Sequence, residues 1–104
     1  MSRPAIIYIS GPISGLKKEE YMANFKAADK KLKAAGYWTF NPAEANDKMP
    51  PWFKHEDFME ICHAEMILCD MVCMLDDWEH SNGACTEKFW AEQEKKHIFT
   101  VHEI

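Results

Sequence analysis

The chain has 104 residues, of which 47% are hydrophobic, and 12 basic against 17 acidic side chains give a formal net charge of −5 at pH 7. This length predicts a single domain over residues 1–104 and leaves no room for a second. Because proteins bind duplex nucleic acid largely by neutralising its phosphates with Lys and Arg, an acidic chain without a basic stripe is not expected to bind such a polymer. A domain this small has a thin stability margin, which self-association would widen.

The sequence holds no run near the ~20 apolar residues of a membrane span, and residues 1–5 lack the apolar core of a signal peptide. We therefore expect a cytoplasmic protein with no membrane partner. Its cysteines form no CxxC motif, so in a reducing compartment we expect them to be small buried hydrophobic side chains; they are Cys62, Cys69, Cys73 and Cys85. A zinc site made of Cys62, His63, Cys69 and Cys73 is an alternative with poor spacing.

Strand and helix patterns alternate in the first half of the chain. Residues 5–9 are apolar and β-branched, which predicts a strand buried on both faces. Helical periodicity over about 19–35, followed by Gly36 as a C-cap candidate, predicts an amphipathic helix. Residues 37–40 predict a short second strand, and 41–51, with three of the five prolines, predict a loop.

The same alternation continues in the second half. The patterns predict a helix from about residue 51 or 52 to 68, a strand over 71–75, a loop over 76–82, a helix over 83–96 and a strand over 97–101. This order predicts a small doubly wound α/β fold, with about four parallel strands and three helices on both faces of the sheet. Ligands bind such sheets beyond the carboxyl ends of the strands, which draws attention to residues 10–15, 41–46 and 76–87.

The first strand-end segment is rich in glycine and serine. It reads Ser10, Gly11, Pro12, Ile13, Ser14 and Gly15, and backbone N–H groups and hydroxyls of such a loop can approach an anion closely. The segment matches neither GxGxxG nor a Walker loop, and the missing lysine argues against a nucleoside triphosphatase. A structural turn after a buried strand is the alternative.

The segment before and within the last predicted helix holds an unusual carboxylate. Glu87 shares a helix face with Ala84 and Ala91, and two alanines mark that face as closely packed. A carboxylate in such a place has the chemistry to attack or stabilise an anomeric carbon of a sugar. The alternative is an exposed Glu87 that interacts only with the helix dipole.

Other polar and aromatic residues of the predicted strand ends could support such a site. Ser81 can cap the helix that Gly83 lets approach the sheet, and it suits a phosphate or sugar hydroxyl. Tyr8 could hold Glu87 through its phenol, or simply pack in the core. Three further ligand-binding candidates are Asn41, Asp76 and Trp78, of which Asp76 could equally belong to a solvated loop.

These residues carry a resemblance that covers nearly the whole chain. Its motifs are Tyr8-Ile9-Ser10-Gly11-Pro12-Ile13-Ser14-Gly15, Asn41-Pro42-Ala43-Glu44 and Trp78-x-x-Ser81-x-Gly83-Ala84-x-x-Glu87. They resemble the nucleoside 2-deoxyribosyltransferase-like superfamily, and within it the small bacterial and phage branch. The resemblance implies a flavodoxin-like fold and cleavage or transfer at the N-glycosidic bond of a (deoxy)nucleoside or its 5′-monophosphate, without a metal or organic cofactor, in a homodimer or higher homo-oligomer.

The resemblance also implies roles for individual residues. Glu87 matches the nucleophilic glutamate that forms a glycosyl-enzyme intermediate, Tyr8 matches the tyrosine that orients it, and Ser81 matches a serine that contacts the 5′-phosphate. The sequence departs from the superfamily at Cys62, which stands where an aspartate assists protonation of the leaving base. It departs again at Ser14, which stands where nucleotide hydrolases have an arginine.

The departure at Cys62 leaves the proton donor open. His63 and Asp57 lie nearby on the same predicted helix and are candidates for that role. A protein that binds a small nucleotide without catalysis is therefore the alternative to an enzyme. A flavodoxin-type electron carrier does not fit, because no Ser/Thr-rich phosphate loop follows the first strand.

Overall fold

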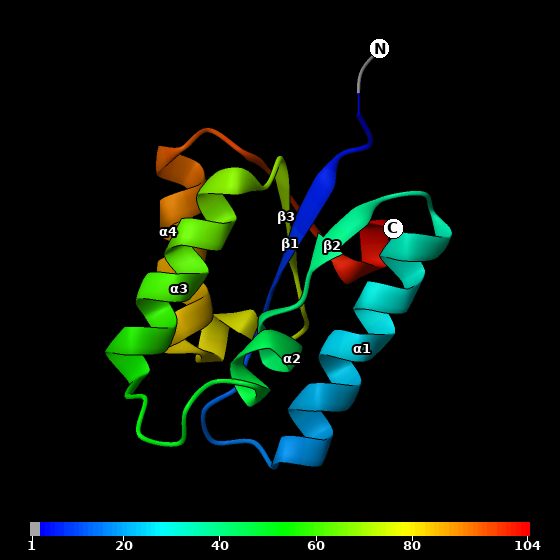
Figure 1. Ribbon diagram of the computed structural model, residues 1–104. Helices are drawn as coiled ribbons and strands as arrows, with labels where there is room; N and C mark the ends of the chain where they lie inside the picture. The colour runs from blue at the N-terminus through cyan, green and yellow to red at the C-terminus, as the bar shows by residue number, and fades with distance from the viewer. Residues whose placement is uncertain (1–2) are drawn as a thin grey trace.

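Four parallel strands form the centre of the fold (Figure 1). The computed structural model describes residues 3–104; Met1 and Ser2, which begin the segment inspected for a signal peptide, lie outside the described residues. The elements are β1 (Ile6–Ser10), α1 (Lys18–Ala34), β2 (Trp38–Phe40), α2 (Pro42–Asp47), α3 (His55–Leu68), β3 (Met71–Met74), the 3-10 helix η1 (Trp78–His80), α4 (Asn82–Gln93), β4 (His97–Thr100) and the 3-10 helix η2 (Val101–Glu103).

The strand order is β2-β1-β3-β4, and all three pairings are parallel. The predicted parallel α/β fold is thus confirmed, and the order is consistent with a small flavodoxin-like domain. The chain reverses its direction of winding between β1 and β3. In sheets of this kind the crevice at that switch point is where ligands bind.

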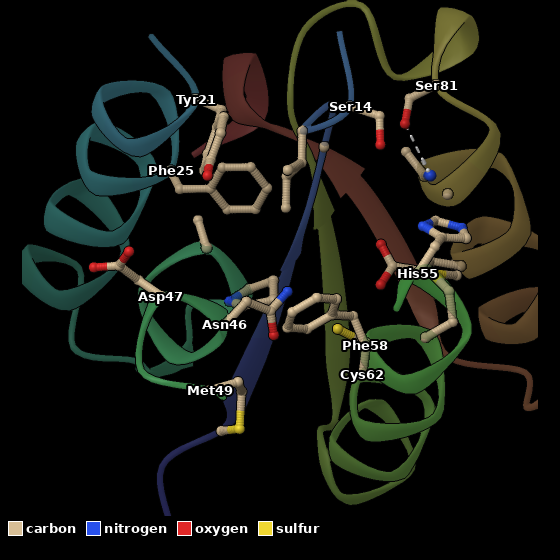
Figure 2. A pocket seen from close by; sticks show the side chains of 18 of the residues that line it. Ser14, Tyr21, Phe25, Asn46, Asp47, Met49, His55, Phe58, Cys62 and Ser81 are labelled. Atoms are coloured by element: carbon tan, nitrogen blue, oxygen red, sulfur yellow. Dashed lines mark hydrogen bonds between the residues drawn. The ribbon is translucent and has the colours of Figure 1, made fainter. Parts of the chain in front are cut away.

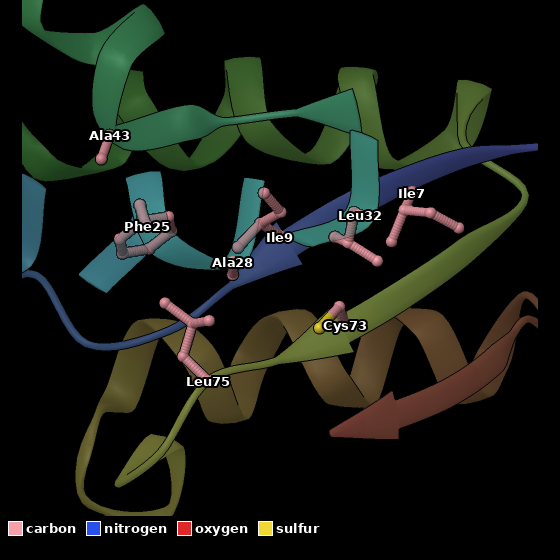
Figure 3. Packing of buried hydrophobic residues seen from close by; sticks show 8 residues of the cluster. All are labelled: Ile7, Ile9, Phe25, Ala28, Leu32, Ala43, Cys73 and Leu75. Carbon is pink, nitrogen blue, oxygen red and sulfur yellow. The ribbon is translucent and has the colours of Figure 1, made fainter. Parts of the chain in front are cut away.

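Each face of the sheet is covered by helices because the side chains of β1 alternate between the two faces. Ile7 and Ile9 pack against α1 through Phe25 and Leu32, and Figure 3 shows this cluster. Tyr8 points to the other face, where α3 and α4 contribute a second buried cluster. Figure 1 accordingly shows α1 on one side of the strands and α3 with α4 on the other.

The predicted loop over 41–51 contains an α-helix, and the predicted loop over 76–82 contains the 3-10 helix η1. Residues 42–47 form α2, whereas a loop over 41–51 was the expectation, so that prediction is wrong for this stretch. The helix forms because Pro42 occupies its first position and the Asn41 side chain accepts a 3.2 Å hydrogen bond from the Glu44 N–H. Because α2 forms, residues 3–104 hold four α-helices where three were predicted, and the following helix, α3, begins at His55 rather than at residue 51 or 52.

Three of the cysteines are buried as predicted, and Cys85 is exposed, so the prediction is wrong for Cys85. Cys85 lies on the outer side of α4, where its thiol faces the backbone oxygens of Trp78 and Glu79. Among residues 3–104, no helix combines the length and apolar character needed to cross a bilayer.

Candidate active site

A cavity of about 930 Å³ lies at the carboxyl end of the strands (Figure 2). Its walls come from the loop after β1, the first half of α1, α2, the segment before α3, α3 itself and the start of α4. The lining residues predicted from the sequence are Gly11, Ile13, Ser14, Gly15, Ser81, Gly83 and Glu87, together with Cys62. The cavity thus collects side chains that lie more than seventy positions apart in the sequence.

Glu87 is the buried acid of this cavity. It lies on α4 and is only 6% exposed, on the face that also buries Ala84 and Ala91. The small alanine side chains let α4 approach the sheet closely, which explains how a carboxylate reaches the strands. The prediction of a packed face is confirmed, and the alternative of an exposed Glu87 is wrong.

Two hydroxyls from β1 hold the Glu87 carboxylate. The Tyr8 phenol donates a hydrogen bond to Oε2, and the Ser10 hydroxyl donates one of 2.7 Å to Oε1. Tyr8 and Ser10 are two residues apart on a strand, so their side chains point to the same face of the sheet. Tyr8 is itself fixed by stacking on Phe40 of β2, with 5.6 Å between ring centroids.

The surroundings of Glu87 change its acidity. Burial raises the pKa of its carboxyl from 4.5 to about 7, against the opposing effect of the hydrogen bonds from Tyr8, Ser10 and Cys62. Burial and the neighbouring carboxylate also raise the pKa of Tyr8 well above its ordinary value. The Tyr8 phenol therefore remains a proton donor, while Glu87 exchanges between its neutral and anionic forms near neutral pH.

Cys62 lies beside this pair on α3. Burial raises the pKa of its thiol to about 11, so the side chain stays protonated at neutral pH. It contributes to the buried cluster that contains Tyr8 and Met66. At this position Cys62 supplies a weak hydrogen-bond donor and apolar bulk, but no acid that titrates near neutrality.

The loop after β1 passes close to the end of β3. A Cβ at Gly11 would lie 2.7 Å from the Leu75 side chain, so only glycine fits there. Gly15 has a φ of 86°, which side-chain-bearing residues rarely adopt. Ile13, Ser14 and Gly15 line the cavity, whereas Pro12 is not among the lining residues.

The start of α4 forms another wall. The Ser81 hydroxyl accepts a 3.2 Å hydrogen bond from the Ala84 N–H and so caps the helix, as predicted. Gly83 in the first turn faces α3, so the expectation that it lets the helix approach the sheet is wrong. A Cβ at Gly83 would lie 3.8 Å from Met59 Sδ and 4.0 Å from His55 Cε1.

Three predicted binding residues serve other purposes outside the cavity lining. Asn41 caps α2. Asp76 is exposed and bonds to His102 at 2.6 Å. The Trp78 ring lies under the Lys88 ammonium, 5.3 Å from its centroid.

The two candidate proton donors also lie outside the cavity lining. The His63 ring stacks on Trp90, with centroids 4.1 Å apart. The Asp57 carboxylate accepts a 2.8 Å hydrogen bond from the Lys54 N–H and so caps α3. The helix presents both residues to surfaces that do not border the cavity.

Several of the lining residues were not predicted individually from the sequence, although two of them, Asn46 and His80, lie in the strand-end segments singled out there. Most are apolar or aromatic, and the others are polar: Tyr21, Phe25, Met49, Phe53, Phe58, Met59, His55, His80, Asn46, Asp47 and Lys18. Helical periodicity places Tyr21 and Phe25 on the apolar face of α1. That face packs in the core, and its first half also lines the cavity. Figure 2 shows Phe25 and Phe58 facing the same space from opposite sides.

Within residues 3–104, no group of three or more His, Cys, Asp or Glu side chains is placed to hold a metal ion. The zinc alternative fails geometrically, since the His63 ring is stacked on Trp90 and Cys73 lies in the cluster on the opposite face of the sheet from Cys62.

A family model described as a domain of unknown function (DUF4406) matches residues 5–100. The chain belongs to this family. The matched segment runs from the residue before β1 to the end of β4, so the DUF4406 domain includes the whole cavity lining. No curated protein matches the sequence.

Proposed function

We propose that the protein cleaves or transfers a base at the N-glycosidic bond of a (deoxy)nucleoside or its 5′-monophosphate, with Glu87 as the nucleophile. The observation that carries the proposal is the Glu87 carboxylate, which is buried at a strand-end cavity and is held through both oxygens by Tyr8 and Ser10. The resemblance of its motifs to the nucleoside 2-deoxyribosyltransferase-like superfamily supports the same reaction class.

The geometry of Glu87 supports a covalent route. A carboxylate oxygen of Glu87 attacks C1′ of the sugar as oxocarbenium character develops, and the base departs. The two donors on β1 fix the attacking group before the substrate arrives, which lowers the entropic cost of reaching the transition state. Water or a second base then attacks C1′ and releases Glu87.

The cavity suits a small substrate with a flat ring. Phe25, Phe53 and Phe58 supply apolar and aromatic wall for a base, and Ser14 and Ser81 supply hydroxyls for a sugar or phosphate. A volume of about 930 Å³ is at the upper end of ordinary small-molecule sites, so a nucleotide, or a nucleoside with an acceptor base, has room.

Base release tests this proposal. The protein is incubated with deoxynucleosides and their 5′-monophosphates, with and without an acceptor base, and the products are separated by chromatography. Release or exchange by the wild type that is lost in Glu87→Gln and kept in Glu92→Gln supports the proposal, because Glu92 lies on the same helix but is exposed. Substrate binding without any turnover would contradict it.

A binding protein without catalysis is the second candidate. Cys62 favours it, since the pKa of about 11 gives this thiol little power to protonate a leaving base near neutral pH. Tight binding of a nucleotide that leaves the ligand intact, and that Glu87→Gln does not weaken, is the outcome that selects this candidate over the enzyme.

The proposal includes a cytoplasmic location and a homodimer or larger assembly. Exposed apolar side chains support self-association, because Trp38 is 67% exposed and Leu68 is 69% exposed beside the same shallow hollow. Sedimentation velocity of the wild type and of Trp38→Ser with Leu68→Ser measures the assembly. A monomer at all concentrations in the wild type would contradict this part.

A further inference from the structure

The cavity contains a histidine that no part of the proposed mechanism yet uses. His55 is the first residue of α3, and its Cε1 lies 4.0 Å from the position that a Cβ of Gly83 would occupy. Gly83 belongs to the first turn of α4 and precedes Glu87 by four residues, so the two lie on one face of that helix. The His55 ring therefore lies beside the N-terminal end of the helix face that carries Glu87.

This spacing suits a nucleophile and an acid that act on the same bond. Four residues of α-helix rise by about 6 Å. In retaining glycosidases the two carboxyl groups, which act as nucleophile and acid, are separated by ~5–5.5 Å. The helical step from Gly83, which His55 adjoins, to Glu87 is of the same order, so the proposal places the glycosidic bond between Glu87 and His55, with the base directed toward the imidazole.

We propose that His55 is the catalytic acid that protonates the departing base, in the place left open by Cys62. The inference rests on the proposed function. An imidazole side chain both gives up and takes up a proton, and histidine is the residue that most often serves as general acid or base in enzymes. Figure 2 shows His55 on the same side of the cavity as Ser81 and Cys62.

The other polar groups of the cavity are less suited to this role. Asp47 forms an ion pair with Lys18 and lies by α1 and α2, across the cavity from His55 (Figure 2). The Tyr8 phenol is committed to Glu87, and its pKa is raised well above its ordinary value. His80 also borders the cavity, from the end of η1, and is the competing candidate that the experiment includes.

The steps balance in atoms and electrons. As Glu87 bonds to C1′, the bond from C1′ to the base nitrogen breaks, its electron pair goes to the base, and the imidazolium proton of His55 moves to the base. The neutral imidazole next takes a proton from water, or from the N–H of an acceptor base, as that molecule attacks C1′. As the new bond to C1′ forms, the bond between C1′ and the Glu87 oxygen breaks, and its electron pair returns Glu87 to a carboxylate.

The test compares a base that needs a proton with one that does not. The wild type, His55→Gln and His80→Gln are assayed on 2′-deoxyguanosine and on 7-methyl-2′-deoxyguanosine, or on their 5′-monophosphates, because the methylated base leaves neutral without protonation. If the enzyme accepts only pyrimidines, the pair is 2′-deoxyuridine and its 5-fluoro analogue, whose base leaves more readily as an anion. His63→Gln is the matched control, since His63 stacks on Trp90 outside the cavity lining.

We expect His55→Gln to lower kcat about 10²–10⁴-fold on the ordinary base and only a few-fold on the activated base. His63→Gln and His80→Gln should leave the ratio of kcat on the activated base to kcat on the ordinary base unchanged. Equal losses on both bases, or a selective loss in His80→Gln instead, would overturn the assignment of His55. A wild type that releases no base from any substrate would instead contradict the proposed function itself.

Discussion

The Ser10 hydroxyl donates a 2.7 Å hydrogen bond to the Glu87 carboxylate although 77 positions separate the two residues in the chain. Both side chains are buried, Ser10 completely and Glu87 to all but 6%. This bond joins β1, an inner strand of the sheet, to the helix that carries the proposed nucleophile. We expect the loss of this bond to change the pKa of Glu87 and to leave the fold intact.

Ser10→Ala should raise the pH at which activity appears. The hydrogen bond from Ser10 lowers the pKa of Glu87, and its loss therefore raises that pKa further above the present value of about 7. The acidic limb of the kcat/KM profile reports this group in the free enzyme and should move to higher pH. Thr86→Ala is the control, because Thr86 precedes Glu87 on α4 but bonds to the Asn82 carbonyl. An unmoved limb would contradict the role given to Ser10.

Stability should fall as pH rises through the range in which Glu87 ionises. The folded state holds this proton with a pKa of about 7, whereas the ordinary value is 4.5, so between these values the folded chain binds more protons than the unfolded chain. The contribution of Glu87 to the free energy of unfolding is fully present below about pH 4.5. It decreases as the pH rises to about 7, by an amount on the order of 3 kcal/mol. Urea unfolding of the wild type and Glu87→Gln at several pH values measures the difference, which should shrink with falling pH.

Tyr8→Phe should destabilise the protein by about 1–3 kcal/mol at pH 8, because the ionised Glu87 then keeps only part of its buried hydrogen bonding. The ring is retained, so stacking on Phe40 persists and packing alone cannot explain the loss. Chemical unfolding gives the stability. The same variant at pH 5, where Glu87 is neutral, should be less affected. A loss that is equal at both pH values would point to packing instead.

Gly11→Ala should destabilise the protein by about 1–3 kcal/mol, since the added methyl group meets the Leu75 side chain at 2.7 Å. Gly83→Ala is a matched substitution in which the nearest atom lies at 3.8 Å, an ordinary contact. In the first turn of α4 that change should be neutral or stabilising by about 0.5–1 kcal/mol. Thermal unfolding should therefore shift to lower temperature in Gly11→Ala but not in Gly83→Ala, and equal losses in the two variants would refute this account.

The sequence predicted the sheet and the placement of Glu87 because both depend on local periodicity. Buried strands are continuous apolar runs, and Ala84 with Ala91 identify the packed face of α4. The prediction placed a loop at 41–51 because its prolines suggest irregular structure, whereas Pro42 starts a short helix capped by Asn41. Composition alone does not distinguish a proline that ends a strand from one that begins a helix.

A different reason explains why the sequence did not predict which histidine lines the cavity. Assigning His63 to the site required knowing how α3 is rotated about its axis and where it begins. The helix begins at His55 and packs through Cys62 and Met66, which turns His63 toward Trp90. Rotation of this kind is set by tertiary packing, since the apolar residues of α3 are not confined to one narrow stripe.

Because Glu87 is held from β1, the two walls of the cavity should differ in how readily they open. Tyr8 and Ser10 lie on a strand with neighbours on both sides, so their backbone amides should exchange with solvent deuterium most slowly. The opposite wall is the six-residue helix α2 and the segment that leads to α3, which has few buried side chains and should exchange much faster. A ligand of the cavity would therefore enter by displacing that wall, while the Glu87 carboxylate, the proposed nucleophile, keeps its alignment.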